Sequence, residues 1–247
     1  MAFFDFLKKG KGDNRPEVTA RISSKTSTNK ISQGYTTEIS DFPLGEEKFR
    51  ELLLFSEEKE LRPRIPTLKG CRALEISPRQ SSLTSLLQLM SPSLIARVGG
   101  KREKEMAMVP DAHFVLSHWE SLPFVEGSWD FILLRNQFSK LSLSRVLREA
   151  SRVLKPGGMI LLSDFHPFSE MVQKEHMKSP VGEDALNPGF EKYFKFFKES
   201  DLNLDSVKEF FFDGSLRKYF EGSSSHKEMF ESLRKTPFLI FFLLQKE

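Results

Sequence analysis

The sequence predicts an α/β protein with a mostly parallel sheet that helices cover on both faces. Short apolar segments of strand length alternate with amphipathic helical segments from about residue 70 onward, and this is the pattern of β–α–β units. The strand segments are short and apolar, as expected for a sheet that is covered on both sides. A chain of 247 residues is long enough for one such domain with a large core.

The first predicted element is an amphipathic helix over Glu46–Glu60, which Pro63 and Pro66 end. One side of this helix carries Phe49, Leu52, Leu53 and Leu54. Strands are then predicted over Arg72–Ile76, Ser93–Val98, His113–Leu116, Trp129–Leu134, Met159–Phe165, Val207–Phe212 and Phe238–Gln245. Further helices are predicted over Ser82–Met90, Ser144–Leu154 and Phe190–Phe197. The last two strands are separated by a helical stretch, which suits an antiparallel pair at one edge of the sheet.

The helix over Ser144–Leu154 has the strongest pattern, because its apolar residues recur at helical spacing. It ends at Lys155-Pro156-Gly157-Gly158. A lysine suits the negative end of the helix dipole, and the glycines permit a left-handed turn.

Residues 1–40 are predicted to form a flexible tail ahead of a domain that spans residues 41–247. The tail is rich in Ser, Thr, Lys, Gly and Asn and lacks periodicity, so it cannot bury enough surface to offset its ordering entropy. Its apolar tip holds Phe3, Phe4, Phe6 and Leu7. This tip is either an anchor for a membrane surface or a protein, or a frayed terminus that folds back on the domain.

The composition excludes several classes of function. A net charge of +3 does not indicate a nucleic-acid-binding protein. Cys71 is the only cysteine, which rules out an intramolecular disulfide and suits a reducing compartment. No apolar run is long enough to cross a bilayer, and the N-terminus lacks the order of a signal peptide, so we expect a cytoplasmic protein. The spacing of the histidines and acids does not support a metal site.

Two segments resemble the class I S-adenosylmethionine-dependent methyltransferases, in particular the small "type 11" methyltransferase-domain proteins. Ser121–Phe131 is similar to their LPF…sFD segment, and Leu147–Gly158 is similar to their REAxRVLKPGG helix and turn. The resemblance implies a Rossmann-like methyltransferase fold whose seven-stranded sheet has one antiparallel strand, the last. It also implies a cofactor half over about residues 68–165 and a substrate and edge part over about residues 166–247.

S-adenosylmethionine is the cofactor that the resemblance implies, and its site would lie beyond the strand ends. The family places a GxGxG turn after the first strand, following an acidic residue. Here the acid matches Glu75, and the glycine positions match Ser77, Arg79 and Ser81. Arg79 would clash in such a turn, and its charge would repel the sulfonium of the cofactor.

Two further contacts of the family pocket are also altered. The carboxylate that accepts the ribose hydroxyls falls near Lys101, although Glu103 is available if the loop is rearranged. The aspartate that accepts the adenine amino group matches His118, whose neutral ring still offers one acceptor. Trp119 beside it is either a residue that stacks on a purine or a core residue.

Arg135 and Asn136 follow the fourth predicted strand, where the family places residues near the transferred methyl group. His166, after the fifth strand, is a weak candidate for a general base. Basic residues near the strand ends are expected to form an anion-attracting cleft, or else are scattered solvated charges. This basic set comprises Arg79, Lys101, Arg102, Lys104 and Arg135.

Two hypotheses follow. In the first, the chain is a non-catalytic methyltransferase-fold protein with a degraded cofactor site, which binds an unknown protein partner or a small anionic ligand. In the second, it is an active but divergent methyltransferase that acts on a small molecule.

Overall fold

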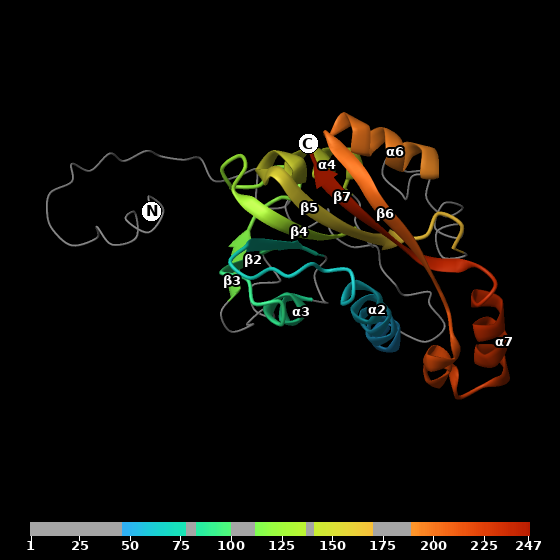
Figure 1. Cartoon of the computed structure of the whole chain (residues 1–247). Coiled ribbons are helices and arrows are strands. Elements are labelled where there is room, and N and C mark those ends of the chain that lie inside the picture. The colour runs from blue at the N-terminus through green and yellow to red at the C-terminus, as the bar shows by residue number, and fades with distance from the viewer. Residues whose placement is uncertain (1–45, 78–82, 100–111, 137–140, 170–188) are drawn as a thin grey trace, which may run out of the picture.

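The computed structural model describes residues 46–77, 83–99, 112–136, 141–169 and 189–247, which form a seven-stranded sheet with helices on both faces (Figure 1). The strands are β1 (Arg72–Ile76), β2 (Leu94–Gly99), β3 (Ala112–Leu116), β4 (Trp129–Arg135), β5 (Leu154–Phe165), β6 (Leu202–Phe211) and β7 (Pro237–Lys246). The helices are α2 (Glu46–Leu61), α3 (Thr84–Gln88), α4 (Leu143–Val153), α6 (Phe190–Glu199), α7 (Ser224–Leu233) and the 3₁₀ helix η2 (Gly214–Phe220). The predicted tail and its tip lie outside these residues.

The strand order in the sheet is β3-β2-β1-β4-β5-β7-β6. Strands β1 to β5 pair in parallel, and β7 runs antiparallel to both of its neighbours, β5 and β6. This confirms the predicted fold class, including the antiparallel last strand. None of the helices in the described ranges is long and apolar enough to cross a membrane.

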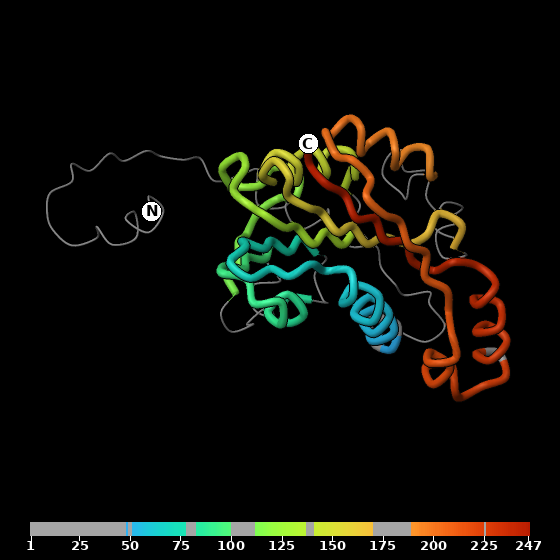
Figure 2. Tube along the Cα trace, viewed as in Figure 1, coloured from blue at the N-terminus to red at the C-terminus, as the bar shows by residue number. Residues whose placement is uncertain are grey.

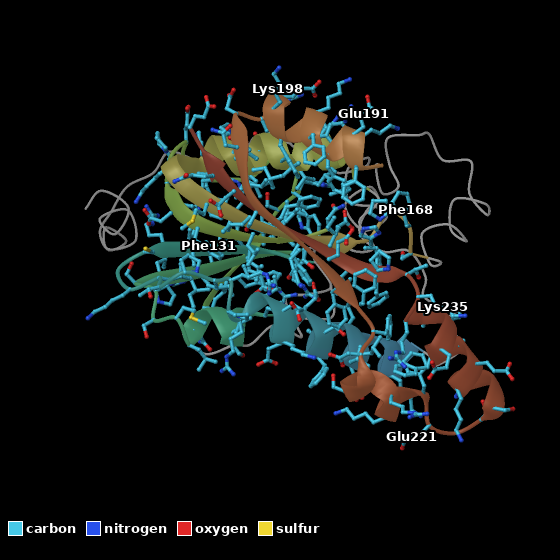
Figure 3. All side chains as sticks on the ribbon, turned by 45° about the vertical axis from the view of Figure 1, so that its right-hand side comes forward. Phe131, Phe168, Glu191, Lys198, Glu221 and Lys235 are labelled. Atoms are coloured by element: carbon cyan, nitrogen blue, oxygen red, sulfur yellow. The ribbon has the colours of Figure 1, made fainter. Side chains whose placement is uncertain are left out.

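Alternate residues of the sheet supply two separate cores. Ala73, Phe131 and Leu161 face α2 and α3 on one side, whereas Leu74 and Ile132 face α4 and α6 on the other (Figure 1). Side chains fill both layers (Figure 3). Strands covered on both faces need apolar residues at every position, which is why their sequences show no alternation.

Most predicted elements agree with the structure, and the differences lie in three places. Helix α3 is shorter than the predicted Ser82–Met90. Strand β5 begins at Leu154 instead of Met159, directly after α4. Strand β6 begins at Leu202, ahead of the predicted Val207, because it is an edge strand whose exposed side chains need no apolar pattern.

The chain between β6 and β7 forms an extension that lies beyond the end of the sheet (Figure 2). It contains η2 and α7, which pack through Phe220 and Phe230, with ring centroids 5.2 Å apart. Lys59 of α2 reaches Asp213 at the start of this extension at 2.5 Å. The extension is therefore joined to α2 as well as to the sheet.

The two family-like segments bind each other. Arg152 on α4 donates hydrogen bonds to the carbonyls of Phe124 (2.9 Å) and Leu122 (3.0 Å) and pairs with Glu149 (2.9 Å). Glu149 in turn accepts from the Leu122 amide at 2.9 Å. The Arg152 hydrogen bond holds the pKa of the Glu149 carboxyl below its ordinary value. These residues therefore serve to build the fold.

The first residues of β5 include two glycines that are required for different reasons. Gly157 has a φ of 74°, in the left-handed region that favours glycine. A Cβ on Gly158 would lie 2.8 Å from the Leu154 side chain and 2.9 Å from the Lys155 carbonyl oxygen. Gly157 thus has the predicted left-handed conformation, but it lies within β5, and α4 ends three residues earlier at an extended Leu154.

Replacing Arg152 with Met is expected to lower the free energy of unfolding by roughly 1–3 kcal/mol, because two carbonyls and a carboxylate lose their donor. Urea denaturation measures this change. Arg148→Met is the matched control, since Arg148 lies on the same helix and is exposed. Equal stability of the two variants would contradict the role given to Arg152.

Candidate functional site

The carboxyl ends of the parallel strands meet at one edge of the sheet, where ligands bind in open α/β folds. Polar side chains are buried at this edge, unlike the apolar residues of the strand centres. They are Glu75, Ser77, Arg97, Arg135, Asn136, Ser163, Asp164 and His166, together with Glu57 from α2.

At the end of β1, Glu75 is fully buried and holds the start of α3. Its carboxylate accepts from the Leu83 amide at 2.9 Å and from the Thr84 hydroxyl. Ser77 is also fully buried, and its hydroxyl contacts no hydrogen-bond partner among the described residues. Arg79 and Ser81 lie outside those residues.

At the end of β2, the last strand residue is Gly99, which has no side chain to offer a ligand. The predicted position Lys101, its neighbours Arg102 and Lys104, and the alternative Glu103 lie outside the described residues. Arg97, two residues before Gly99, is only 5% exposed. The sequence analysis did not single it out, although a charged residue within an otherwise apolar buried strand was a usable signal.

At the end of β3, His118 is half-buried and its carbonyl accepts from the Ser121 amide at 3.2 Å. Trp119 is fully buried in the core on the α4 side, with Leu122 and Leu143. The structure thus places Trp119 as a core residue, and its burial contradicts the alternative in which it stacks on a purine.

At the end of β4, Arg135 is fully buried and forms an ion pair with Glu57 of α2. The pair is bidentate, because Arg135 Nε donates to one carboxylate oxygen at 3.0 Å and Nη2 to the other. Ser163 on β5 donates to the same carboxylate at 2.8 Å. The expectation that Arg135 adds positive charge to an open cleft is therefore wrong.

A second polar cluster lies on the opposite face of the same strands. Asp164 accepts from Asn136 Nδ2 at 2.7 Å, the Tyr193 hydroxyl at 2.8 Å and the Phe165 amide at 2.8 Å. Burial raises the pKa of Asp164 to about 6, although these hydrogen bonds oppose the rise, and the charge of Glu57 raises it further. The Asn136 carbonyl oxygen is buried without a partner among the described residues.

His166 is buried after β5, and both of its ring nitrogens are occupied. Nδ1 accepts from the Phe168 amide at 3.1 Å, so Nε2 carries the hydrogen and donates to Glu209 at 2.9 Å. Burial lowers the pKa of His166, and Glu209 opposes this only in part. Phe168 lies beside the Glu191 end of α6 (Figure 3), and its ring centroid is 5.4 Å from that of His166. In this arrangement neither nitrogen is placed to accept a proton from a substrate.

Two other features of the described residues lie apart from this edge. A cavity of about 690 Å³ is lined by residues of η2, of α7 and of the segments beside them, including Arg217, Phe220 and Lys235. None of its lining residues is a predicted site residue. Within the described ranges, no group of three or more His, Cys, Asp or Glu residues is arranged to hold a metal ion.

The raised pKa of Asp164 predicts a pH-dependent stability. The folded protein holds this proton more tightly than the unfolded chain, whose ordinary value is 3.8, so the stabilisation is complete below pH 3.8 and is lost as the pH rises through 6. The loss amounts to about 3 kcal/mol at most. Urea denaturation measures the free energy of unfolding of wild type and of Asp164→Asn between pH 4 and 7.5. As the pH rises over this range, the value for wild type should fall relative to that for Asp164→Asn by up to this amount. A difference that does not vary with pH would contradict the assignment.

Comparisons with known proteins agree with this architecture. The family described as "Methyltransferase domain" matches residues 88–162. The phthiotriol/phenolphthiotriol dimycocerosates methyltransferase 1 of Mycobacterium ulcerans is 32% identical over 115 residues, which cover 44% of this chain and 42% of the relative. The ubiquinone/menaquinone biosynthesis C-methyltransferase UbiE of Enterobacter sp. is 30% identical over 115 residues, which cover 42% of this chain and 44% of the relative. The chain thus spans less than half the length of these curated relatives.

Solved structures show the same fold at lower identity. An S-adenosylmethionine-dependent methyltransferase from Mesorhizobium loti has a TM-score of 0.60 and 14% identity, covering 79% of this chain and all of that one. The geranyl diphosphate C-methyltransferase of Streptomyces coelicolor A3(2) has a TM-score of 0.58 and 13% identity. The match covers 87% of this chain and 90% of that one. The chain is therefore similar in sequence to a methyltransferase domain over residues 88–162, and it shares the fold of the S-adenosylmethionine-dependent methyltransferases.

Proposed function

We propose that this chain is a non-catalytic member of the family, a binding or regulatory protein whose S-adenosylmethionine site has been lost. Its ligand is a protein partner or a small anion. The observation that carries this proposal is that the buried carboxylates described at the carboxyl edge of the sheet are already bonded to groups within the protein.

The family holds the ribose of the cofactor with a carboxylate at the end of the second strand. Here β2 ends at Gly99. The buried carboxylates near this edge are bonded within the protein: Glu75 to the start of α3, Glu57 to Arg135 and Ser163, and Asp164 to Asn136 and Tyr193. Among the described residues, a ribose would have to break one of these buried contacts to find a carboxylate acceptor, which disfavours cofactor binding there.

Charge supports the same proposal. The cofactor carries a positive sulfonium, and Arg97 places a buried guanidinium near the ends of β1 and β2. Like charges repel strongly where water is excluded, so this guanidinium disfavours a sulfonium. Arg79 and Lys101 add two more cations to the adjoining loops of the sequence.

The extent of the family match is a third support. It begins at residue 88, beyond the segment Ser77–Ser81 that takes the place of the glycine-rich turn. The similarity is therefore concentrated in the segments that build the fold, where Arg152 and Glu149 join α4 to the loop before β4.

One observation favours the alternative, an active methyltransferase that acts on a small molecule. The raised pKa of Asp164 and the unpaired carbonyl oxygen of Asn136 both lie at the ends of β4 and β5. Strongly shifted pKa values cluster at catalytic sites, so this pair would be the place to look for a base. The enzyme would then hold its cofactor through Glu103, His118 and an opened Trp119.

Calorimetric titration in phosphate-free buffer separates the two functions. With S-adenosylmethionine and, separately, S-adenosylhomocysteine, we expect no saturable binding up to about 1 mM, which corresponds to less than about 4 kcal/mol. Binding at tens of micromolar, about 6 kcal/mol, would overturn the non-catalytic proposal. The double variant Arg79→Gly with Lys101→Asp is expected to gain affinity if these two groups are the main obstacle.

A further inference from the structure

Arg97 is a buried cation for which no ion pair is seen among the described residues. Its side chain is 5% exposed, and neither Nε nor Nη2 contacts a hydrogen-bond partner in the described part of the chain. A guanidinium stays protonated in proteins, so this group cannot escape its burial by losing a proton. An unpaired buried charge is strongly unfavourable, and a ligand that neutralises it would be stabilised accordingly.

The acids on the same face of the sheet are already engaged. In the parallel pairing of β1 and β2, Arg97 lies opposite Glu75, but Glu75 accepts hydrogen bonds from the Leu83 amide and the Thr84 hydroxyl. Glu57 is held by Arg135. Neither carboxylate forms an ion pair with Arg97.

A second buried group without a partner lies on the same face. Ser77 follows Glu75 by two residues, and side chains two apart in an extended segment point to the same side. Its hydroxyl is fully buried and lacks a partner among the described residues. β2 and the residue that follows β1 therefore carry three donor groups that lack partners in the described ranges: Nε–H and Nη2–H of Arg97 and the Ser77 hydroxyl.

We propose that Arg97 and Ser77 bind a phosphate group, either as inorganic phosphate or as part of a small phosphate ester. Nε–H and Nη2–H lie on one side of the guanidinium and match two oxygens of an oxyanion in a bidentate contact. The serine hydroxyl offers a third donor, which suits a tetrahedral anion better than a planar carboxylate. The negative charge of Glu75 nearby weakens the interaction, so we expect a Kd on the order of 1 mM for inorganic phosphate.

This inference names the small anion of the proposed function and rests on that function. The two fail separately, because titration with S-adenosylmethionine tests the loss of the cofactor site and titration with phosphate tests the anion site. The other buried arginine, Arg135, cannot bind an anion in this way, because Glu57 already occupies its guanidinium.

The test is a titration of the whole chain with sodium phosphate, glycerol phosphate and acetate at constant ionic strength, followed by calorimetry. Wild type should bind both phosphates saturably and acetate at least about tenfold more weakly, because acetate lacks the third oxygen. Tighter binding of sodium phosphate would identify the free ion as the ligand, and tighter binding of glycerol phosphate would identify a phosphate ester. Equal affinity for acetate, or the absence of saturable phosphate binding, would overturn the proposal.

Variants locate the site. Arg97→Gln should weaken phosphate binding by at least about tenfold, and Ser77→Ala by about two- to fivefold, as expected for a charged and a neutral donor. Arg145→Gln is the matched control, since the Arg145 side chain is 69% exposed, and its affinity should equal that of wild type. Unchanged binding by Arg97→Gln would refute the assignment.

Two readouts hold even if Arg97→Gln does not fold. In wild type, the Arg97 Nε–H resonance should move saturably with phosphate in nitrogen-filtered NMR spectra; a fixed resonance would refute the site. In phosphate-free buffer, Arg97→Met should melt no lower than wild type, because it removes an uncompensated buried charge. A clearly lower Tm would show that Arg97 has an internal partner, and would also refute the proposal.

Discussion

The buried ion pair between Glu57 and Arg135 is the interaction on which the carboxyl edge of this sheet depends. It joins α2 to the end of β4, and through Ser163 it also reaches β5. A buried guanidinium and a buried carboxylate are each unfavourable alone, so the position of α2 and the state of the strand ends are coupled. The charge of Glu57 also acts through the sheet on Asp164, where it adds to the rise in pKa caused by burial.

Several other polar groups of the same edge are also bonded within the protein. Glu75 binds the start of α3, Asp164 binds Asn136 and Tyr193, and both nitrogens of His166 are occupied. In a fold that places its ligands at this edge, such closure leaves few groups for a cofactor. The exceptions on the α3 side are Arg97 and Ser77, whose unused donors favour an anion over a sulfonium.

The sequence predicted the fold well, because buried parallel strands have a strong local signal. Strand β1 has the predicted bounds, Arg72–Ile76, and the apolar residues that recur at helical spacing in α4, Val146, Leu147, Ala150 and Val153, are buried. Strand β6 was predicted too short because an edge strand exposes most of its side chains and so lacks that signal. The helical stretch between the last two strands suited an antiparallel pair, and the family resemblance identified the last strand as the antiparallel one.

The site was harder to predict, because its contacts join distant parts of the chain. Glu57 and Arg135 are 78 residues apart, and no local pattern reveals that they pair. The sequence therefore suggested an exposed Arg135, and it left open whether Trp119 lay in the core. Arg97 could have been singled out from the sequence, because a charge inside an apolar strand requires an explanation. That its Nε and Nη2 lack partners among the described residues is visible only in three dimensions.

The account rests on the claim that the ends of β1, β2 and β3 do not hold S-adenosylmethionine. The most direct measurement is a ¹H–¹⁵N NMR titration with S-adenosylmethionine in phosphate-free buffer, which follows the backbone amides of Ser77, Gly99 and His118. We predict that these three signals stay in place up to about 1 mM cofactor, the concentration at which a ligand bound by about 4 kcal/mol would half-saturate its site. Saturable shifts of the three amides, with a common Kd in the micromolar range, would contradict the claim.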